Sequence, residues 1–125
     1  MQWAKRCEHW YSEFKRVEAG AEAWRHGDLE EYGRLSFESG WSSIHNWESG
    51  APEQIKLYEI MRETDGIYGG RFSGAGFKGC CIALIDPDKQ EEISEKVTRE
   101  YLKAFPHLEG KYGVYITRSS EGIQL

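Results

Sequence analysis

Apolar residues recur every three or four positions near the start of the chain, which predicts one long amphipathic helix. This stripe consists of Trp3, Cys7, Trp10, Phe14, Val17, Ala21 and Trp24. The spacing places all of them on one helical face, and a stripe over several heptads is also typical of a coiled-coil seam. Because so bulky a stripe is more often core than a ligand site, we expect it to be buried. Gly27 follows Arg25 and His26, so we expect the helix to end there.

A second helix is predicted to begin at Asp28. Asp28 and Glu31 have the spacing of a capping box, in which each side chain satisfies free backbone groups of the first turn. The continuation over residues 36–47 is mixed, because serines and a glycine weaken helix propensity while apolar residues keep one face. Small residues here would let another element pack closely. Ser42 and Ser43 are alternatively polar contacts for a ligand.

Residues 52–85 predict a third helix and then two strands. Pro52 suits the first turn of a helix, and the Gly66 region ends it. Strands are expected at about 67–73 and 80–85, with an ordered loop between them.

The last part of the chain predicts a fourth helix and a final strand. Asp86 and Pro87 have the cap-and-proline pattern of a helix start, and the helix is expected to stop before Pro106. Alternating apolar residues predict a half-buried strand over 112–117. The order α-α-α-β-β-α-β, with a β-α-β crossover, indicates one α+β domain over residues 1–125, built as a two-layer sandwich.

Charge and composition exclude several classes of function. The net charge of −5 over 125 residues argues against nucleic acid as a partner, because phosphate backbones bind basic surfaces. No apolar run reaches the roughly 20 residues of a membrane helix, and we see no signal-peptide pattern. We therefore expect a cytoplasmic protein without a membrane partner.

The cysteines and histidines predict no metal site. Cys7, Cys80 and Cys81 lack CxxC spacing, and neighbours in a strand point to opposite faces. We expect reduced cysteines that act as small buried hydrophobes. The four histidines are scattered, without a metal-binding pattern.

Glycines crowd the stretch that precedes the second strand. Six of them lie between Gly66 and Gly79, and glycine is favoured where the backbone needs positive φ or where another group comes close. The loop at 73–79 offers consecutive amides and Lys78 without an acidic residue, which suits an anion. The alternative is a glycine-rich hairpin packed under a helix, since short glycine motifs are weak evidence alone.

The segment from Gly70 to Cys80, Gly-Arg-Phe-Ser-Gly-Ala-Gly-Phe-Lys-Gly-Cys, resembles the third motif of the GHMP small-molecule kinases. Residues 27–35 and the Pro52-Glu53 helix start also resemble family segments, so the likeness covers roughly residues 6–116. Lys78 stands where most galactokinases carry glycine. Features such as Phe72-Ser73 are closer to galacturonokinase-like members, which leaves the sugar open between galactose, galacturonate and a related hexose.

The resemblance implies the C-terminal domain of a sugar kinase, a ferredoxin-like α+β unit with additional N-terminal helices. The family's phosphate loop, catalytic Asp and sugar-binding segment belong to an N-terminal domain and have no counterpart in this sequence. In the complete kinase, ATP with Mg²⁺ would phosphorylate the sugar's anomeric hydroxyl, and the third motif would line the cleft between the domains. The implied cofactor-binding residues are Ser73, Gly74, Ala75, Gly76, Phe77, Lys78 and Gly79.

Further expectations follow from the same resemblance. Arg71 is a candidate substrate contact, and no residue of this chain is expected to be catalytic or to hold a metal. The expected partner is the N-terminal kinase domain, in the same chain or a separate one, and the chain alone is expected to be inactive. The alternative is a standalone binding or oligomerisation module that associates with itself through the Trp-rich helix.

Overall fold

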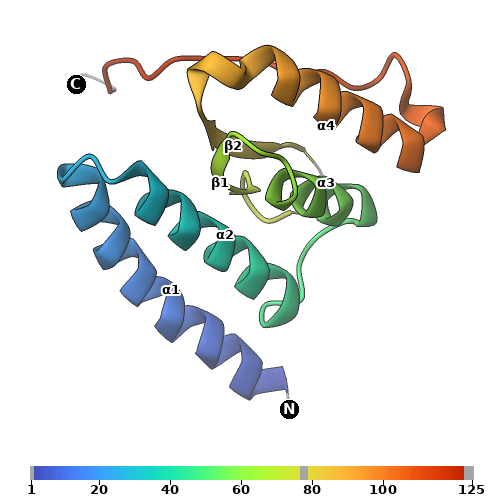
Figure 1. Cartoon of the computed structure of the whole chain (residues 1–125). Helices are drawn as coiled ribbons and strands as arrows, with labels where there is room; N and C mark the ends of the chain where they lie inside the picture. The colour runs from blue at the N-terminus through green and yellow to red at the C-terminus, as the bar shows by residue number, and fades with distance from the viewer. Residues whose placement is uncertain (1, 77–78, 123–125) are drawn as a thin grey trace.

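The computed structural model describes residues 2–76 and 79–122, which form helices and one small sheet (Figure 1). The helices are α1 (Gln2–Arg25), α2 (Leu29–His45), α3 (Pro52–Arg62) and α4 (Gln90–Ala104). The strands are β1 (Ile67–Phe72) and β2 (Cys81–Ile85), and short 3₁₀ turns lie at Pro87–Lys89 and Pro106–Leu108. The predicted α+β class is confirmed.

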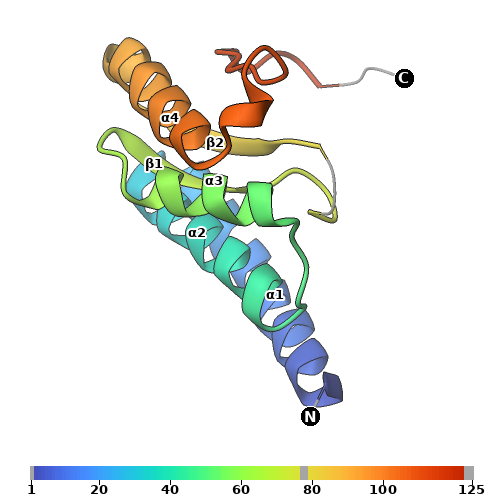
Figure 2. The same cartoon turned by 90° about the vertical axis from the view of Figure 1, so that its right-hand side faces the viewer.

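The elements stack as layers around the hairpin of β1 and β2. Helices α1 and α2 form an antiparallel pair in which α1 is outermost, and α4 lies on the far side of α3 (Figures 1 and 2). The two strands are antiparallel, with Phe72 opposite Cys81 and an irregularity between Ile67 and Gly69. Gly69 lies against Gly33 of α2, whereas Phe72 packs with residues of α3, so β1 runs between these two helices.

Two apolar clusters hold the sheet and the later helices together. Ile60 of α3 packs with Ile93, Val97 and Tyr101 of α4, and Phe72 packs with α3 in the second cluster. Phe72 is the largest fully buried side chain among the described residues, at 1% exposed. Burial of such side chains contributes about 1.5–3 kcal/mol each, so these clusters are the main stabilising core.

The predicted helix starts are largely confirmed. The Asp28 carboxylate accepts a hydrogen bond from the Glu31 backbone N–H at 3.1 Å and caps α2. The mixed stretch remains helical through His45, and its small residues do permit close packing, since a Cβ on Gly40 would lie 2.5 Å from the Tyr58 ring. Asp86 caps a 3₁₀ turn, so α4 begins later than expected, at Gln90.

The predicted strand over 112–117 is wrong. Residues 111–122 are irregular, and within the described ranges β2 pairs with β1 alone. Tyr112 stacks on Tyr101, with 4.6 Å between ring centroids, but Tyr115 is 87% exposed. Alternation of apolar residues gives a strand only where a neighbouring strand satisfies its backbone groups, and this segment has no such neighbour here.

The expectation that the Trp-rich stripe of α1 is buried is also wrong. All of its members are exposed, with Trp3 at 78% and Trp10 at 69%. The face of α1 turned toward α2 carries a different repeat with the same spacing, namely Arg6, His9, Glu13, Arg16, Gly20 and Ala23. These residues meet the small and polar side of α2, where hydrogen bonds such as His9 Nδ1 to Ser42 Oγ at 2.8 Å replace apolar packing.

The cysteine prediction is only partly confirmed. Cys7, Cys80 and Cys81 are all free, but only Cys81 is half-buried and the other two are exposed. Burial raises the pKa of the Cys81 thiol to about 12, with a smaller contribution from Cys80. Among the helices of the described ranges, none is long and apolar enough to span a bilayer.

The close approach of α2 to β1 gives a first test. In Gly33→Ala, the new Cβ would lie 2.0 Å from the Tyr68 carbonyl oxygen, which belongs to the backbone and cannot rotate away. We expect urea unfolding to show a loss of at least about 2 kcal/mol.

Gly20→Ala in α1 is the matched control for this substitution. Its Cβ would make only ordinary contact with Tyr32, at 3.7 Å, and alanine favours a helix by up to about 1 kcal/mol. Equal stability of the two variants would show that the backbones of α2 and β1 are not in close contact at Gly33.

Candidate functional site

The glycine loop between β1 and β2, residues 73–80, is closed at its base by the hairpin. The Ser73 backbone N–H donates to the Cys80 carbonyl at 3.0 Å, directly after the last strand pair. Five of the predicted cofactor contacts lie in the described part of this loop. Ser73, Gly74, Ala75 and Gly76 follow β1, and Gly79 precedes β2. Phe77 and Lys78, also predicted to contact the cofactor, lie outside the described residues.

The glycines are needed for both of the reasons that the sequence suggests. Gly74 and Gly76 have φ of +85° and Gly79 has φ of +116°, a region that residues with a Cβ avoid. Gly76 is also buried, and a Cβ there would lie 2.3 Å from the Phe72 ring. The described part of the loop, residues 73–76, therefore packs against the buried Phe72 ring.

The loop is tied to the start of α3. The Ala51 backbone N–H donates to the Gly76 carbonyl at 2.7 Å, one residue before the helix begins. Figure 2 shows the connection between β1 and β2 beside this end of α3. Ser73, Gly74 and Ala75 are exposed, and because Gly74 has no side chain, its exposed surface is backbone. Gly74 is the exposed residue of this part with positive φ, and its role in binding an anion stays a prediction.

Arg71 points toward the helices and away from the exposed part of the loop. Its Nη1 donates to Glu13 Oε2 at 3.0 Å and also contacts Ser39 Oγ, while its Nε donates to the Phe72 carbonyl at 3.1 Å. The Arg71 side chain is 30% exposed and that of Glu13 is 24% exposed. The guanidinium thus joins α1, α2 and the end of β1. Its role as a substrate contact stays a prediction.

Glu13 is the centre of this polar group. Burial alone would raise the pKa of Glu13, but hydrogen bonds from Ser39 and Arg16, with the charges of Arg16 and Arg71, lower it below its ordinary value. Burial lowers the pKa of nearby His9, and the charges of the same two arginines act in that direction, against Glu13. A carboxylate between two guanidiniums therefore stays ionised while the imidazole favours its neutral form.

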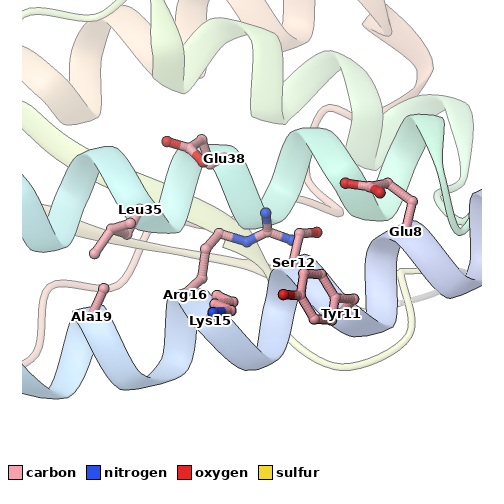
Figure 3. Close-up of a pocket in the computed structure, with 8 residues that line it drawn as sticks. All are labelled: Glu8, Tyr11, Ser12, Lys15, Arg16, Ala19, Leu35 and Glu38. Atoms are coloured by element: carbon pink, nitrogen blue, oxygen red, sulfur yellow. The ribbon is translucent and has the colours of Figure 1, made fainter.

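Two hollows lie along α1. One, of about 620 Å³, includes Glu13, Ser39 and Arg71 in its wall. The other, of about 340 Å³, lies on the opposite flank, where Arg16 extends from α1 toward α2 (Figure 3). Neither is lined by described residues of the glycine loop.

The described residues contain no group of carboxylates, histidines or cysteines arranged to hold a metal ion. Sequence reasoning found the loop and missed Glu13 and Ser39. The only signal for Glu13 was its place in the polar repeat of α1, beside His9 and Arg16.

Comparisons with known proteins agree on one family. The family model described as GHMP kinases C terminal matches residues 21–104. The galacturonokinase of Arabidopsis thaliana is 53% identical over 103 residues, which are 82% of this chain and 24% of that protein. The galactokinase of Pyrococcus furiosus is 32% identical over 108 residues, which are 86% of this chain and 30% of that protein.

A solved structure has the same fold. The crystal structure of Lactococcus lactis galactokinase complexed with galactose matches with a TM-score of 0.80 and 29% sequence identity. The match covers 85% of this chain and 27% of that one. The chain thus spans only 24% to 30% of the length of these three relatives.

The buried glycine of the loop gives a second test. In Gly76→Ala, both the positive φ and the collision with Phe72 oppose the new Cβ. We expect a loss of about 3 kcal/mol in urea unfolding, since left-handed backbone costs about 1–2 kcal/mol and overpacking adds to it.

Gly74→Ala separates these two causes. Gly74 has the same φ of +85° but has nothing within 4 Å of an added Cβ, so only about 1 kcal/mol should be lost. If the two variants lose equal stability, the packing of Phe72 under the loop is not what orders it.

Proposed function

The chain belongs to the GHMP kinase C-terminal family, and from this premise we propose that it is the C-terminal domain of an ATP-dependent sugar kinase. The 53% identity to a galacturonokinase and the fold of a galactokinase support a hexose or hexuronate as the sugar. The observation that carries the proposal is the glycine loop, whose exposed backbone is ordered by Phe72 and by the bond from Ala51 to Gly76. The reaction would transfer the γ-phosphate of ATP to the anomeric hydroxyl of the sugar.

In this proposal the glycine loop lines the cleft between two kinase domains. Gly74, Ala75 and Gly79 would offer backbone contacts and Ser73 its hydroxyl, because the Ser73 N–H already bonds Cys80, with Gly76, Phe77 and Lys78 completing the loop. The loop suits phosphate groups because it combines glycines of positive φ with exposed residues and contains no carboxylate. Phosphoryl transfer depends mainly on positioning and charge stabilisation, which such a loop assists without acting as acid or base.

The other wall of the site would come from the N-terminal kinase domain. Because the described residues lack a carboxylate group suited to Mg²⁺, the metal that accompanies ATP would be held by that domain and the phosphates. The catalytic base and most sugar contacts would lie there too. Arg71 stays a candidate substrate contact. On this account the chain alone is inactive, and its cytoplasmic location stays a prediction.

The exposed stripe of α1 supports contact with that domain. Trp3, Trp10, Phe14, Val17 and Trp24 are each more than half exposed, and an apolar face of this kind marks an interaction surface. The start of α1 is connected to the glycine loop through residues 46–51: Arg6 donates to the Asn46 carbonyl at 2.7 Å, and Ala51 donates to Gly76. One segment, residues 46–51, therefore contacts both the start of α1 and the glycine loop.

The second candidate function is a standalone module that associates with itself. The same exposed tryptophans favour it, because two copies could bury their stripes against each other as a coiled-coil pair does. In this case no kinase chemistry is expected, and the glycine loop is only a tight hairpin connection.

Reconstitution tests the kinase proposal. We expect that mixing the chain with the N-terminal domain of a closely related galacturonokinase gives ATP-dependent phosphorylation of galacturonate or galactose, while each part alone is inactive. Gly74→Ala probes the part that the glycine loop plays in this phosphorylation, because it alters the exposed loop where nothing packs against the new Cβ. Failure of the two parts to form any complex would contradict the proposed partnership.

Sedimentation of the chain alone separates the two candidates. If α1 mediates self-association, Trp10→Ser with Phe14→Ser should weaken it about 1,000-fold, since each of the two buried aromatics contributes roughly 2 kcal/mol. Tyr115→Ser is the control, because Tyr115 is 87% exposed and lies far from α1 in the sequence. A monomer at high concentration in the unaltered chain removes the case for a self-associating module.

A further inference from the structure

We propose that Glu13 and Ser39 are positioning residues that hold the glycine loop in place through Arg71. The role rests on the proposed function, since it matters for chemistry only if the loop lines a phosphate site. The three residues come from α1, α2 and β1, and their polar atoms meet between these elements.

Arg71 is hydrogen-bonded to the backbone at the end of β1. Its Nε donates to the carbonyl of Phe72, the last residue of β1. The next residue, Ser73, makes the bond to Cys80 that closes the loop. The guanidinium is thus fixed to the peptide group from which the loop starts. Rotation of that peptide would move both the Ser73 amide and the Phe72 ring under Gly76.

The Arg71 guanidinium is held in turn by Glu13 and Ser39. Glu13 Oε2 accepts from Arg71 Nη1 at 3.0 Å and from Ser39 Oγ at 2.6 Å, while Oε1 accepts from Arg16 Nε at 2.9 Å. Every one of these bonds is made to an ionised carboxylate, and charge-assisted bonds are roughly twice as strong as neutral ones. Arg71 is therefore held at a defined position, which a solvated arginine at the end of a strand would not be.

The same helix, α1, carries both this polar group and the exposed apolar stripe. Glu13 lies next to Phe14 in α1, so the same helix turn carries the carboxylate inward and a stripe residue outward. Helix α1 is the outermost layer, with α2 between it and the sheet (Figure 1). The pair of Glu13 and Arg71 crosses that layer directly. A partner that binds the outer face of α1 and holds it still would therefore also hold the start of the glycine loop, through Glu13 and Arg71.

Amide hydrogen exchange of the chain tests the positioning role without any catalytic assay. Two amides report on the loop: Ser73, bonded to Cys80, and Ala51, bonded to Gly76. In Glu13→Gln, which keeps the shape and loses the charge, we expect both to exchange about tenfold faster. Amides in the α3 and α4 cluster, such as that of Val97, should be unchanged. Ser39→Ala should act in the same direction and serves if Glu13→Gln does not fold.

Two controls make the result specific. Glu22→Gln removes an exposed ion pair with Arg25 on the same helix and should leave both loop amides as they are. If Glu13 acts only through Arg71, then Glu13→Gln combined with Arg71→Gln should exchange no faster than Arg71→Gln alone. Unchanged Ser73 and Ala51 exchange in Glu13→Gln, or additive effects in the double variant, would overturn the proposal.

A kinetic measurement in the reconstituted kinase separates this inference from the proposed function. Glu13→Gln should lower kcat about tenfold with little change in KM for the sugar, because Glu13 does not touch substrate. Absence of activity in the unaltered complex would overturn the kinase proposal and leave the exchange result standing. Full activity in Glu13→Gln would overturn the catalytic relevance of the positioning role while the kinase proposal stands.

Discussion

The arrangement of this domain depends on the contact between α2 and β1, where two glycines let backbone meet backbone. A Cβ on Gly69 would lie 2.3 Å from the Gly33 carbonyl oxygen, and a Cβ on Gly33 would collide with Tyr68. No side chain separates helix from strand, so α1, one layer further out, still comes within reach of the sheet. That is why Glu13 can bond Arg71, 58 residues away in the sequence. Bulkier residues at this contact would push α1 away and break the polar group that holds Arg71.

The two faces of α1 are oriented opposite to those of an ordinary amphipathic surface helix, which buries its apolar face. Its polar repeat, which includes Glu13 and Arg16, faces α2, and its tryptophans face outward. Exposed tryptophan leaves a large apolar surface in water, and burial of that surface would be favourable. Such a face is consistent with a domain whose other half is supplied by a partner, and the chain spans only 24% of its galacturonokinase relative.

Sequence reasoning succeeded where a local rule decides the structure. The cap at Asp28, the proline start of α3 and the ordered glycine loop all follow from conformational preferences of single residues. It failed where a partner element decides. The α1 sequence contains two repeats of equal spacing, and hydrophobicity alone selects the tryptophans. Among the residues that the structure describes, the alternation at 112–117 has no neighbouring strand to pair with. The bond between Glu13 and Arg71 joins residues too far apart for any local pattern.

We propose that the outer face of α1 and the glycine loop meet the same partner domain. The most direct test is the hydrogen-exchange footprint of this chain when a matching N-terminal kinase domain is added. We expect slower exchange in two places at once, the first half of α1 and residues 73–76, with α4 unchanged. Protection of α4 with none at α1 or the loop would contradict it.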